Sequence, residues 1–354
     1  MTSSQFPSKS SKTARSRRPL PKWLLTINVL YALTIALISL CNAIGPERWW
    51  FIAFNMYMPQ AIWLAPGVFL LLVTLGFQWR SAWIPVLVMA WVAGPLMGVV
   101  PHAPQPDVTR ASDVFLRVMT YNVKWGREDP QAVVADIQKY NPDLIVMQDS
   151  AGVQQTAVGT AFATYDVQVD GQYTIASRLP VSSLTGVDIS FPGSDHHCDR
   201  FRLLVGGTEV TIYTAHLLSP RVGLSNVRHH HIKPMKENVA DRLIEGQLLT
   251  TNYEEDQAAN PAPAVLMGDL NSPPPSMVVR ELTSAGLHDA FSAAGSGYGY
   301  SYGGLTVIGA PYIRIDHIMV NKYFRVSKCW VGNSIGSDHS PLIADLVKVA
   351  TRSN

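Results

Sequence analysis

The first hundred residues follow a different pattern from the rest of the chain. They contain three long uncharged stretches, over residues 23–41, 49–79 and 81–100. About twenty apolar residues in a helix cross the hydrocarbon core of a bilayer. Tryptophans, which favour the headgroup layer, stand near the ends of these stretches at Trp23, Trp49, Trp50, Trp79 and Trp83. The pattern predicts a membrane domain over 23–100, with about three transmembrane helices.

Positive charges predict how these helices are oriented. Residues 1–22 carry six Lys or Arg and no acidic residue, so this basic tail is expected in the cytoplasm. Three spans then place everything after residue 100 outside, whereas two would leave it in the cytoplasm. A cleaved signal peptide is the alternative, but no small-x-small pattern follows the first stretch. A lipoprotein signal is disfavoured because Leu40, and not a small residue, precedes Cys41.

Short strand patterns and helical patterns alternate after residue 113. Runs rich in Val, Ile, Leu and Tyr, bounded by turn-forming residues, occupy 114–122, 143–149, 209–216, 264–271 and 313–320. The spacing predicts helices over 130–140 and 234–250. The second helix would bury Val239, Leu243, Ile244 and Leu248, and a polar loop would follow over 251–263. These elements predict one layered α/β domain over 113–350, behind a proline-rich linker at 101–112 that would act as a stiff spacer lifting the domain off the membrane.

Composition and charge narrow the function. Only 15% of residues are charged, against roughly 25% in a typical soluble domain, which agrees with a part of the chain lying in lipid. Residues 1–100 carry eight basic and one acidic residue, whereas residues 101–354 carry twenty basic and twenty-five acidic ones. A broad electrostatic grip on nucleic acid is therefore disfavoured. The three cysteines lack zinc-site spacing, and Cys198 and Cys329 could pair in an extracytoplasmic domain.

Polar residues gather where the predicted strands end. These positions are Asn122, Gln148-Asp149, His216, Gly268-Asp-Leu-Asn271, Asp316-His317 and Ser337-Asp-His-Ser340. Side chains at strand ends of an α/β sheet converge on one crevice. Carboxylate and amide oxygens suit a hard cation such as Mg²⁺, and the absence of cysteine ligands or an H-E-x-x-H helix disfavours zinc.

The order of these motifs resembles the endonuclease/exonuclease/phosphatase family, whose fold is shared by deoxyribonuclease I. The motifs are Met119-Thr-Tyr-Asn122, Leu144-Ile-Val-Met-Gln-Asp149, Ser177-Arg-Leu-Pro-Val181, Thr214-Ala-His-Leu217, Gly268-Asp-Leu-Asn271, Arg314-Ile-Asp-His317 and Ser337-Asp-His-Ser-Pro-Leu342. The resemblance covers about residues 113–348. It implies a four-layer α/β/β/α sandwich with a metal-dependent site at one end.

The resemblance also implies a role for each residue of the site. The metal ligands would be Asp149, Asn122 and Asp338, holding Mg²⁺ or alternatively Mn²⁺. His339 would be the general base, with Asp316 orienting its imidazole. Asp269 and Asn271 would orient water and phosphate, and His216 would contact the phosphoryl oxygens or assist the leaving group.

Two further positions bear on this resemblance. The family usually has Gln-Glu where this chain has Gln148-Asp149, so a cation would lie deeper or be reached through water. Arg178 is a candidate substrate contact, or alternatively a salt-bridge residue at a sheet edge. Residues 228–231, Arg-His-His-His, are expected in a solvated loop, and the Tyr- and Gly-rich segment 295–302 forms either an aromatic wall or a flexible loop.

Together these features predict a membrane-anchored, Mg²⁺-dependent phosphoesterase whose catalytic domain faces outward. The layout is similar to that of bacterial membrane phosphatases linked to glycopeptide resistance, which implies a polyprenyl or other lipid-linked phosphate as substrate. The motifs do not separate a monoesterase from a diesterase, so an extracytoplasmic nuclease is the second hypothesis. A catalytically silent binding module is the third.

Overall fold

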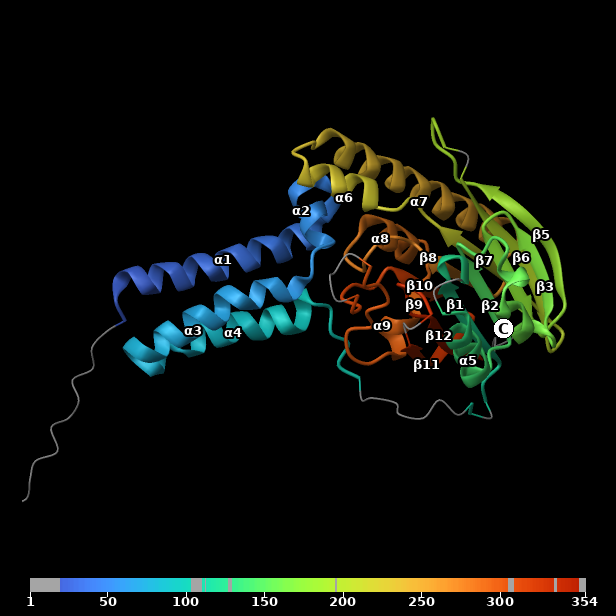
Figure 1. Cartoon of the computed structure of the whole chain (residues 1–354), viewed down its shortest axis with the longest axis horizontal. Helices are drawn as coiled ribbons and strands as arrows, with labels where there is room; N and C mark the ends of the chain where they lie inside the picture. Colours follow the sequence, from blue (N-terminus) through green and yellow to red (C-terminus); the bar gives the residue numbers. More distant parts are fainter. Residues whose placement is uncertain are drawn as a thin grey trace, which may run out of the picture.

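The computed structural model describes residues 20–102, 110–111, 113–126, 129–194, 196–304, 309–333 and 336–349. A rod of helices projects from a layered domain (Figure 1). The predicted basic tail, apart from residues 20–22, and residues 103–109 and 112 of the predicted linker lie outside the described residues.

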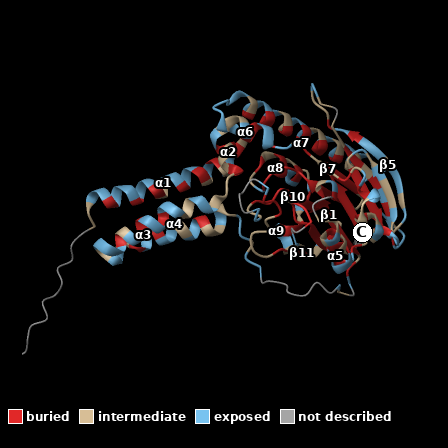
Figure 2. Ribbon diagram, viewed as in Figure 1, coloured by how far each residue is buried: buried red, intermediate tan, exposed pale blue. Residues whose placement is uncertain are grey.

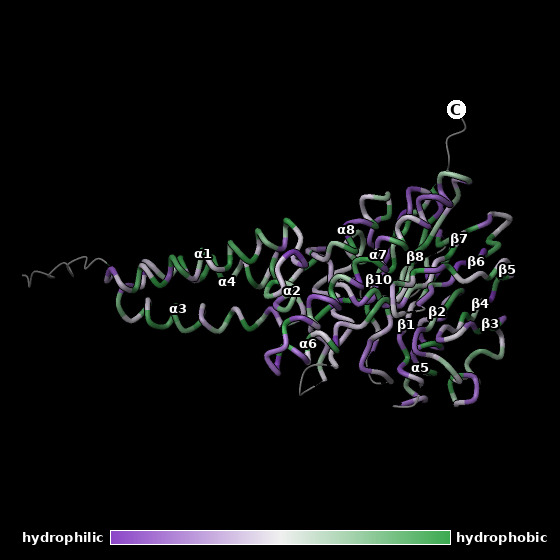
Figure 3. Tube along the Cα trace, turned by 90° about the horizontal axis from the view of Figure 1, so that it is seen from above, coloured by the Kyte–Doolittle hydropathy of each residue, from purple (hydrophilic) through white to green (hydrophobic). Residues whose placement is uncertain are grey.

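The rod consists of α1 (Lys22–Ile44), α3 (Leu64–Gln78) and α4 (Trp83–Trp91), which pack against one another through a small apolar core. Two segments, Lys22–Ile44 and Gln60–Ser81, are long and apolar enough to cross a membrane, and a third, Trp83–Leu96, is shorter. Much of the rod is hydrophobic (Figure 3). Its exposed large side chains include Leu33, Leu37, Phe69, Leu72 and Leu87. An apolar surface of this extent indicates membrane association.

The layered domain contains two six-stranded sheets. The first has the strand order β11-β12-β1-β2-β4-β3 and the second has the order β5-β6-β7-β8-β10-β9. The bounds of the first sheet's strands are β1 Leu116–Asn122, β2 Leu144–Gln148, β3 Asp166–Asp170, β4 Tyr173–Ser177, β11 Phe324–Val331 and β12 Leu342–Lys348. Those of the second are β5 Val181–Asp188, β6 His197–Val205, β7 Thr208–His216, β8 Ala264–Asp269, β9 His288–Asp289 and β10 Asp316–Val320.

Each sheet has one central parallel pair flanked by antiparallel strands. The pair β1–β2 is joined by α5 (Pro130–Tyr140), and the pair β7–β8 is joined by α6 (Arg221–Arg228) and α7 (Lys233–Ala259). The inner faces of the two sheets form the main core, which is buried between them (Figure 2). Helix α5 covers the outer face of the first sheet, while α7 and α8 (Met277–Ser284) cover the second. The predicted α/β/β/α sandwich is therefore confirmed.

Local sequence signals explain the helix α5, which lies where the sequence predicted it. Asp129 caps its N-terminus by accepting a hydrogen bond from the Ala132 amide at 3.0 Å. Pro130 occupies the first helical position, where its missing N–H costs nothing. Asn141 ends the helix in the left-handed region, with φ of 49°.

The domain rests directly on one end of the helical rod. Helix α2 (Trp50–Met56) packs against α6 and α7, and the Tyr57 hydroxyl donates to the Asn271 carbonyl at 2.8 Å. The Glu47 carboxylate accepts hydrogen bonds from the Ser276 hydroxyl at 2.5 Å and the Met277 amide at 3.1 Å. These bonds tie the loop after α1 to the N-terminus of α8.

The end of the rod and the described start of the linker contact the domain directly. Val100, the residue just before the linker, forms two backbone hydrogen bonds with Gly297, of 2.8 and 3.0 Å. The Ser296 hydroxyl also donates to the His102 carbonyl at 2.7 Å. The beginning of the linker is thus part of the domain surface.

The long helix also differs from its prediction. It continues to Ala259, so residues predicted as a polar loop are helical, since Asp256 there pairs with Arg200 of β6 at 2.5 Å. Ile244 is exposed, and the buried face instead carries Arg242 and Glu245. These two polar side chains satisfy the backbone of Leu218, since Arg242 donates to its carbonyl and Glu245 accepts from its amide.

The two domain cysteines do not form the disulfide that the sequence left open. Cys198 lies in the core beneath α7 and α8, whereas Cys329 lies in the core between the sheets. Both thiols are free and buried.

Candidate active site

The candidate site lies where the carboxyl ends of both parallel pairs meet. Asn122 and Gln148 face each other at the ends of β1 and β2, and His216 faces Asp269 at the ends of β7 and β8. The Asn122 side-chain amide donates to Asp269 across the gap between the sheets, at 3.1 Å. The site is therefore a seam between the two sheets, as expected for strand ends in an α/β fold.

The geometry of the motif Gly268-Asp-Leu-Asn271 explains its glycine, its aspartate and its asparagine. Gly268 has φ of 150°, and a Cβ there would lie 1.9 Å from the Ala215 carbonyl oxygen of the neighbouring strand. Only glycine fits this close backbone approach. Asp269 accepts a hydrogen bond from the Asn271 amide at 2.9 Å, while the Asn271 side chain donates to the Leu217 carbonyl at 2.8 Å. The motif thus holds the Asp269 carboxylate at the seam.

His339 and Asp316 form a hydrogen-bonded pair. His339 Nδ1 lies 2.9 Å from Asp316 Oδ2, which also accepts from the Ser301 hydroxyl at 2.6 Å. The other imidazole nitrogen, Nε2, faces Asp269 Oδ2 at 3.6 Å. Burial lowers the pKa of His339, but the carboxylates of Asp316 and Asp269 outweigh it and raise that pKa to about 9. This arrangement fixes the proton on Nδ1 and directs Nε2 into the seam.

His216 is held by a residue in the turn between β3 and β4, which was not among the predicted site residues. Its Nδ1 lies 2.6 Å from the side-chain oxygen of Gln172, between β3 and β4, so Nδ1 carries the donated proton. Its Nε2 lies 3.6 Å from Asp269 Oδ2. No motif signals Gln172, because the hairpin that carries it was not predicted.

The donor groups at the seam fit a divalent cation. Asp149 has φ of 48° and a side chain that is 34% exposed, and its carboxylate lies 3.4 Å from the Asn122 amide nitrogen. The ligand atoms of Asp269, Asp316 and His339 lie within 4.8 Å of one another, and Asp316 Oδ1 is buried without a hydrogen-bond partner. Such a concentration of hard oxygen donors suits Mg²⁺ or Mn²⁺.

Asp338 lies at the rim of the seam beside two cations. Its carboxylate is 3.3 Å from Lys124 Nζ and 3.6 Å from Arg221. The Tyr302 hydroxyl accepts a hydrogen bond from Arg221 at 3.0 Å, and the Tyr302 ring lies 4.6 Å from the His339 imidazole. Lys124 and Arg221 were not among the predicted site residues. Lys124 follows Asn122 by two positions, which is a weak signal, and Arg221 has none.

Arg178 does not lie at the seam. It follows the carboxyl end of β4, which runs antiparallel to β2, and Ser177 pairs with Leu144 at the start of that strand. The Arg178 guanidinium lies 4.8 Å above the ring of Tyr165. The structure does not bring Arg178 together with the other predicted site residues, because the strand direction carries it to the opposite end of the sheet. Residues 228–231 lie at the surface after α6, as expected.

A cavity of about 370 Å³ lies between the helical rod and the domain. Its lining is mostly apolar and includes Trp91 and Met97 from the rod and Tyr298, Tyr300 and Ile313 from the domain. The Tyr298 and Tyr300 rings stack at 5.1 Å, so the Tyr- and Gly-rich segment forms an aromatic wall here. Ile313 bonds through its carbonyl to the Tyr302 amide at 3.0 Å, and Tyr302 packs on His339. Ile313 and Tyr302 therefore connect the wall of the cavity to the seam.

A buried imidazole–carboxylate pair, further carboxylates for a cation and basic groups at the rim define a metal-dependent phosphoesterase site. The sequence profile of the endonuclease/exonuclease/phosphatase family matches residues 119–339. The match covers more than half of the chain, and the chain belongs to this family. It is an enzyme of the metal-dependent phosphoesterases and nucleases.

Solved structures agree with this assignment at the level of the fold. The chain is similar to a truncated TDP2 from Caenorhabditis elegans, with 19% identity and a TM-score of 0.52, over 66% of this chain and 98% of that one. It is also similar to a mannosyl-6-phosphatase from Bacteroides thetaiotaomicron, with 18% identity and a TM-score of 0.51, over 66% and 99%. A 3′ phosphatase from Neisseria, bound to a product DNA hairpin, gives 18% identity and a TM-score of 0.50, over 65% and 98%. A comparison with curated proteins found no significant match.

Proposed function

We propose that the protein is a membrane-anchored phosphoesterase that hydrolyses the phosphate or pyrophosphate ester of a lipid-linked substrate, such as a polyprenyl pyrophosphate. The observation that carries this proposal is the apolar cavity between the rod and the domain, whose wall residue Ile313 is linked through Tyr302 to His339 at the seam. A lipid tail lying along the rod could enter this cavity while its phosphate reached the seam. The hydrogen bond from Tyr57 to Asn271 supports it, because it ties the end of the rod to the site itself.

In the proposed membrane arrangement, the domain boundaries are 1–22 for a cytoplasmic tail, 23–100 for three spans, 101–112 for the linker and 113–350 for the catalytic domain. The order of the helices supports it, since α1 and α4 both end beside the domain while the α3–α4 turn lies at the far end of the rod (Figure 1). The catalytic domain would then be extracytoplasmic. Anchoring would keep the enzyme at high effective concentration near a membrane substrate.

Each polar residue of the seam has a proposed part in the reaction. Asp149 and Asn122, helped by Asp338, would hold Mg²⁺ or Mn²⁺. When bound, the cation offsets the negative charge of the phosphoryl group and of the surrounding carboxylates, which lowers the pKa of His339 below about 9. His339 would then accept a proton at Nε2 from the attacking water, while Asp316 holds the proton on Nδ1.

The remaining groups would position the substrate. Asp269 faces both imidazoles, at 3.6 Å from each Nε2, and would orient the water between them. Asn271 would help to hold that geometry through its backbone bond to Asp269. His216 would contact the phosphoryl oxygens or assist the leaving group. Lys124 and Arg221 at the rim would attract the negative charge of the substrate.

The test is phosphate release by the full chain in detergent or liposomes. Undecaprenyl pyrophosphate, a phospholipid and a DNA hairpin would be compared with Mg²⁺ and with EDTA. We expect metal-dependent release from the polyprenyl lipid, with turnover reduced about 10²–10⁴-fold in His339→Ala and in Asp269→Ala. Arg178→Ala is the matched control, because Arg178 lies at the opposite end of the sheet.

Three outcomes would contradict the proposal. Cleavage of the DNA hairpin alone would make the protein a nuclease, an outcome that the rim cations Lys124 and Arg221 would then explain. Full activity in both seam variants would refute the assignment of the site. A loss of activity in Arg178→Ala as large as that in the seam variants would refute the placement of the substrate.

A further inference from the structure

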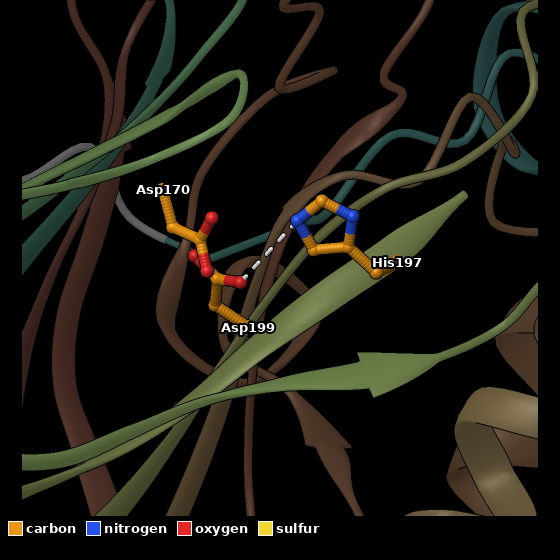
Figure 4. A group of neighbouring side chains, drawn as sticks. All are labelled: Asp170, His197 and Asp199. Atoms are coloured by element: carbon orange, nitrogen blue, oxygen red, sulfur yellow. Dashed lines mark ion pairs between the residues drawn. The ribbon is translucent and has the colours of Figure 1, made fainter. Parts of the chain in front are cut away.

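A second group of possible metal ligands lies away from the seam's own carboxylates. Asp170 ends β3 in the first sheet, and His197 and Asp199 begin β6 in the second sheet. Figure 4 shows the two carboxylates facing each other, with the imidazole of His197 turned toward them. The ligand atoms of the three residues lie within 4.8 Å of one another. The group therefore joins β3, an edge strand of the first sheet, to β6 of the second sheet.

Asp199 is an unusual buried carboxylate. Its side chain is fully buried, and neither of its oxygens has a hydrogen-bond partner. His197 Nε2, at 3.7 Å from Asp199 Oδ1, is also buried without a hydrogen bond. Buried carboxylates are normally paired, as Asp345 is with Arg117 at 2.6 Å. Burial and the nearby charge of Asp170 raise the pKa of Asp199 to about 7, which reflects the missing partner.

We propose that Asp170, His197 and Asp199 bind a divalent transition-metal ion of the Zn²⁺ class that clips the two sheets together. One imidazole and two carboxylates form a mixed nitrogen and oxygen set, which such ions accept in preference to Mg²⁺. Tetrahedral metal–ligand bonds of about 2.0–2.2 Å place the ligand atoms roughly 3.3–3.6 Å apart. His197 Nε2 and Asp199 Oδ1, at 3.7 Å, are already close to that range, and the other ligand atoms, all within 4.8 Å, would reach it by side-chain shifts of at most about 1 Å.

The turn that carries Asp170 also carries a group that touches the candidate active site. Gln172, two residues later, holds His216 Nδ1 at 2.6 Å. The Tyr173 hydroxyl accepts a hydrogen bond from the His216 amide at 2.9 Å and donates to the His197 carbonyl at 3.0 Å. A bound ion would therefore fix this turn and, through it, the orientation of His216. Asp170, His197 and Asp199 are positioning residues in this scheme.

Zinc binding by the full chain in detergent tests the site, after all metal has been stripped with EDTA. Exposed histidines 229–231 would first be changed to Gln in a parent variant, because they could bind Zn²⁺ adventitiously. Bound metal would be counted by mass spectrometry after dialysis, and thermal unfolding would be followed with and without Zn²⁺. Asp166→Asn is the matched control, since Asp166 is an exposed carboxylate at the other end of β3.

We expect Asp199→Asn and His197→Gln each to lose one equivalent of zinc and the zinc-induced rise in Tm. The control should keep both. Without metal, Asp199→Asn should be at least as stable as the parent, because it removes an unpaired buried charge. Asp269→Asn should lose only the metal bound at the seam, which separates this proposal from the proposed function.

Equal zinc stoichiometry and an equal Tm rise in Asp199→Asn, His197→Gln and the Asp166→Asn control would overturn the proposal. If Asp199→Asn does not fold, His197→Gln decides, because that side chain is about one-third exposed. A lower metal-free Tm in Asp199→Asn would show that the carboxylate has a protein partner, and this would also count against the site.

Discussion

The pairing of Asp316 with His339 leads to a quantitative prediction. The pKa of His339 is about 9, against an ordinary value of 6.5. At 1.36 kcal/mol per unit, the difference is about 3 kcal/mol in favour of the imidazolium. Because this pKa is raised on folding, the stabilisation is fully present below pH 6.5 and is lost as the pH rises through about 9. Asp316→Asn removes the largest favourable contribution, so the pKa of His339 should fall clearly below 9, with Asp269 still raising it and burial lowering it.

The assay is a histidine NMR titration of the full chain, with EDTA present to keep divalent cations away. His339→Gln identifies the resonance. Ser301→Ala is the matched control, because it removes the other hydrogen bond to Asp316 Oδ2 but leaves the carboxylate charge in place. The control should titrate near pH 9. A resonance that still titrates near 9 in Asp316→Asn, or equal shifts in both variants, would refute the electrostatic account of the pair.

Three further outcomes are expected. Asp149→Glu should preserve or tighten Mg²⁺ binding in calorimetry, and loss of binding would contradict the seam geometry. Tyr57→Phe should lower the free energy of unfolding by about 1 kcal/mol and reduce turnover, since it removes the bond to the Asn271 carbonyl; unchanged turnover would show that this contact does not serve the site. Arg117→Met should cost about 3–5 kcal/mol in denaturant unfolding, because it leaves the buried Asp345 unpaired, and a near-neutral effect would mean that the carboxylate finds another partner.

The seam was predictable because its residues stand next to strands with strong patterns. β1, β2 and β8 are buried along their whole length. Each therefore appears in the sequence as a mainly apolar run that ends in a polar residue. Gly268 added a further signal, since only glycine fits beside the Ala215 carbonyl. At these positions the residue types beside each strand are enough to indicate where the side chains lie in the folded domain.

The strands from β3 to β6 were not predicted, because they do not share one pattern of apolar and polar residues. β5 is largely exposed and carries Ser, Thr and Gly, while β6 buries Asp199 beside apolar residues. The distance of Arg178 from the seam could not be predicted for a related reason. A motif shows that a residue follows a strand, but the direction of β4 within the sheet depends on its pairing with β2.

The extent of α7 could not be predicted from periodicity either. Its last turns carry consecutive acidic residues, and the helix is retained because Asp256 contacts Arg200 and Tyr213 of the neighbouring sheet. Arg242 and Glu245 occupy buried positions for a similar reason, since both bind the backbone of Leu218. Partners distant in the chain, which no local pattern contains, decide these positions.

The seam has a consequence for how the enzyme loses activity. Neither sheet contains a complete site, because Asn122 and Asp149 come from one sheet while His216, Asp269 and Asp316 come from the other. A small sliding of one sheet over the other would separate these groups while every strand kept its own hydrogen bonds. On heating, inactivation should therefore precede the loss of secondary structure. The activity of the enzyme therefore depends on, and reports, the alignment of the two sheets.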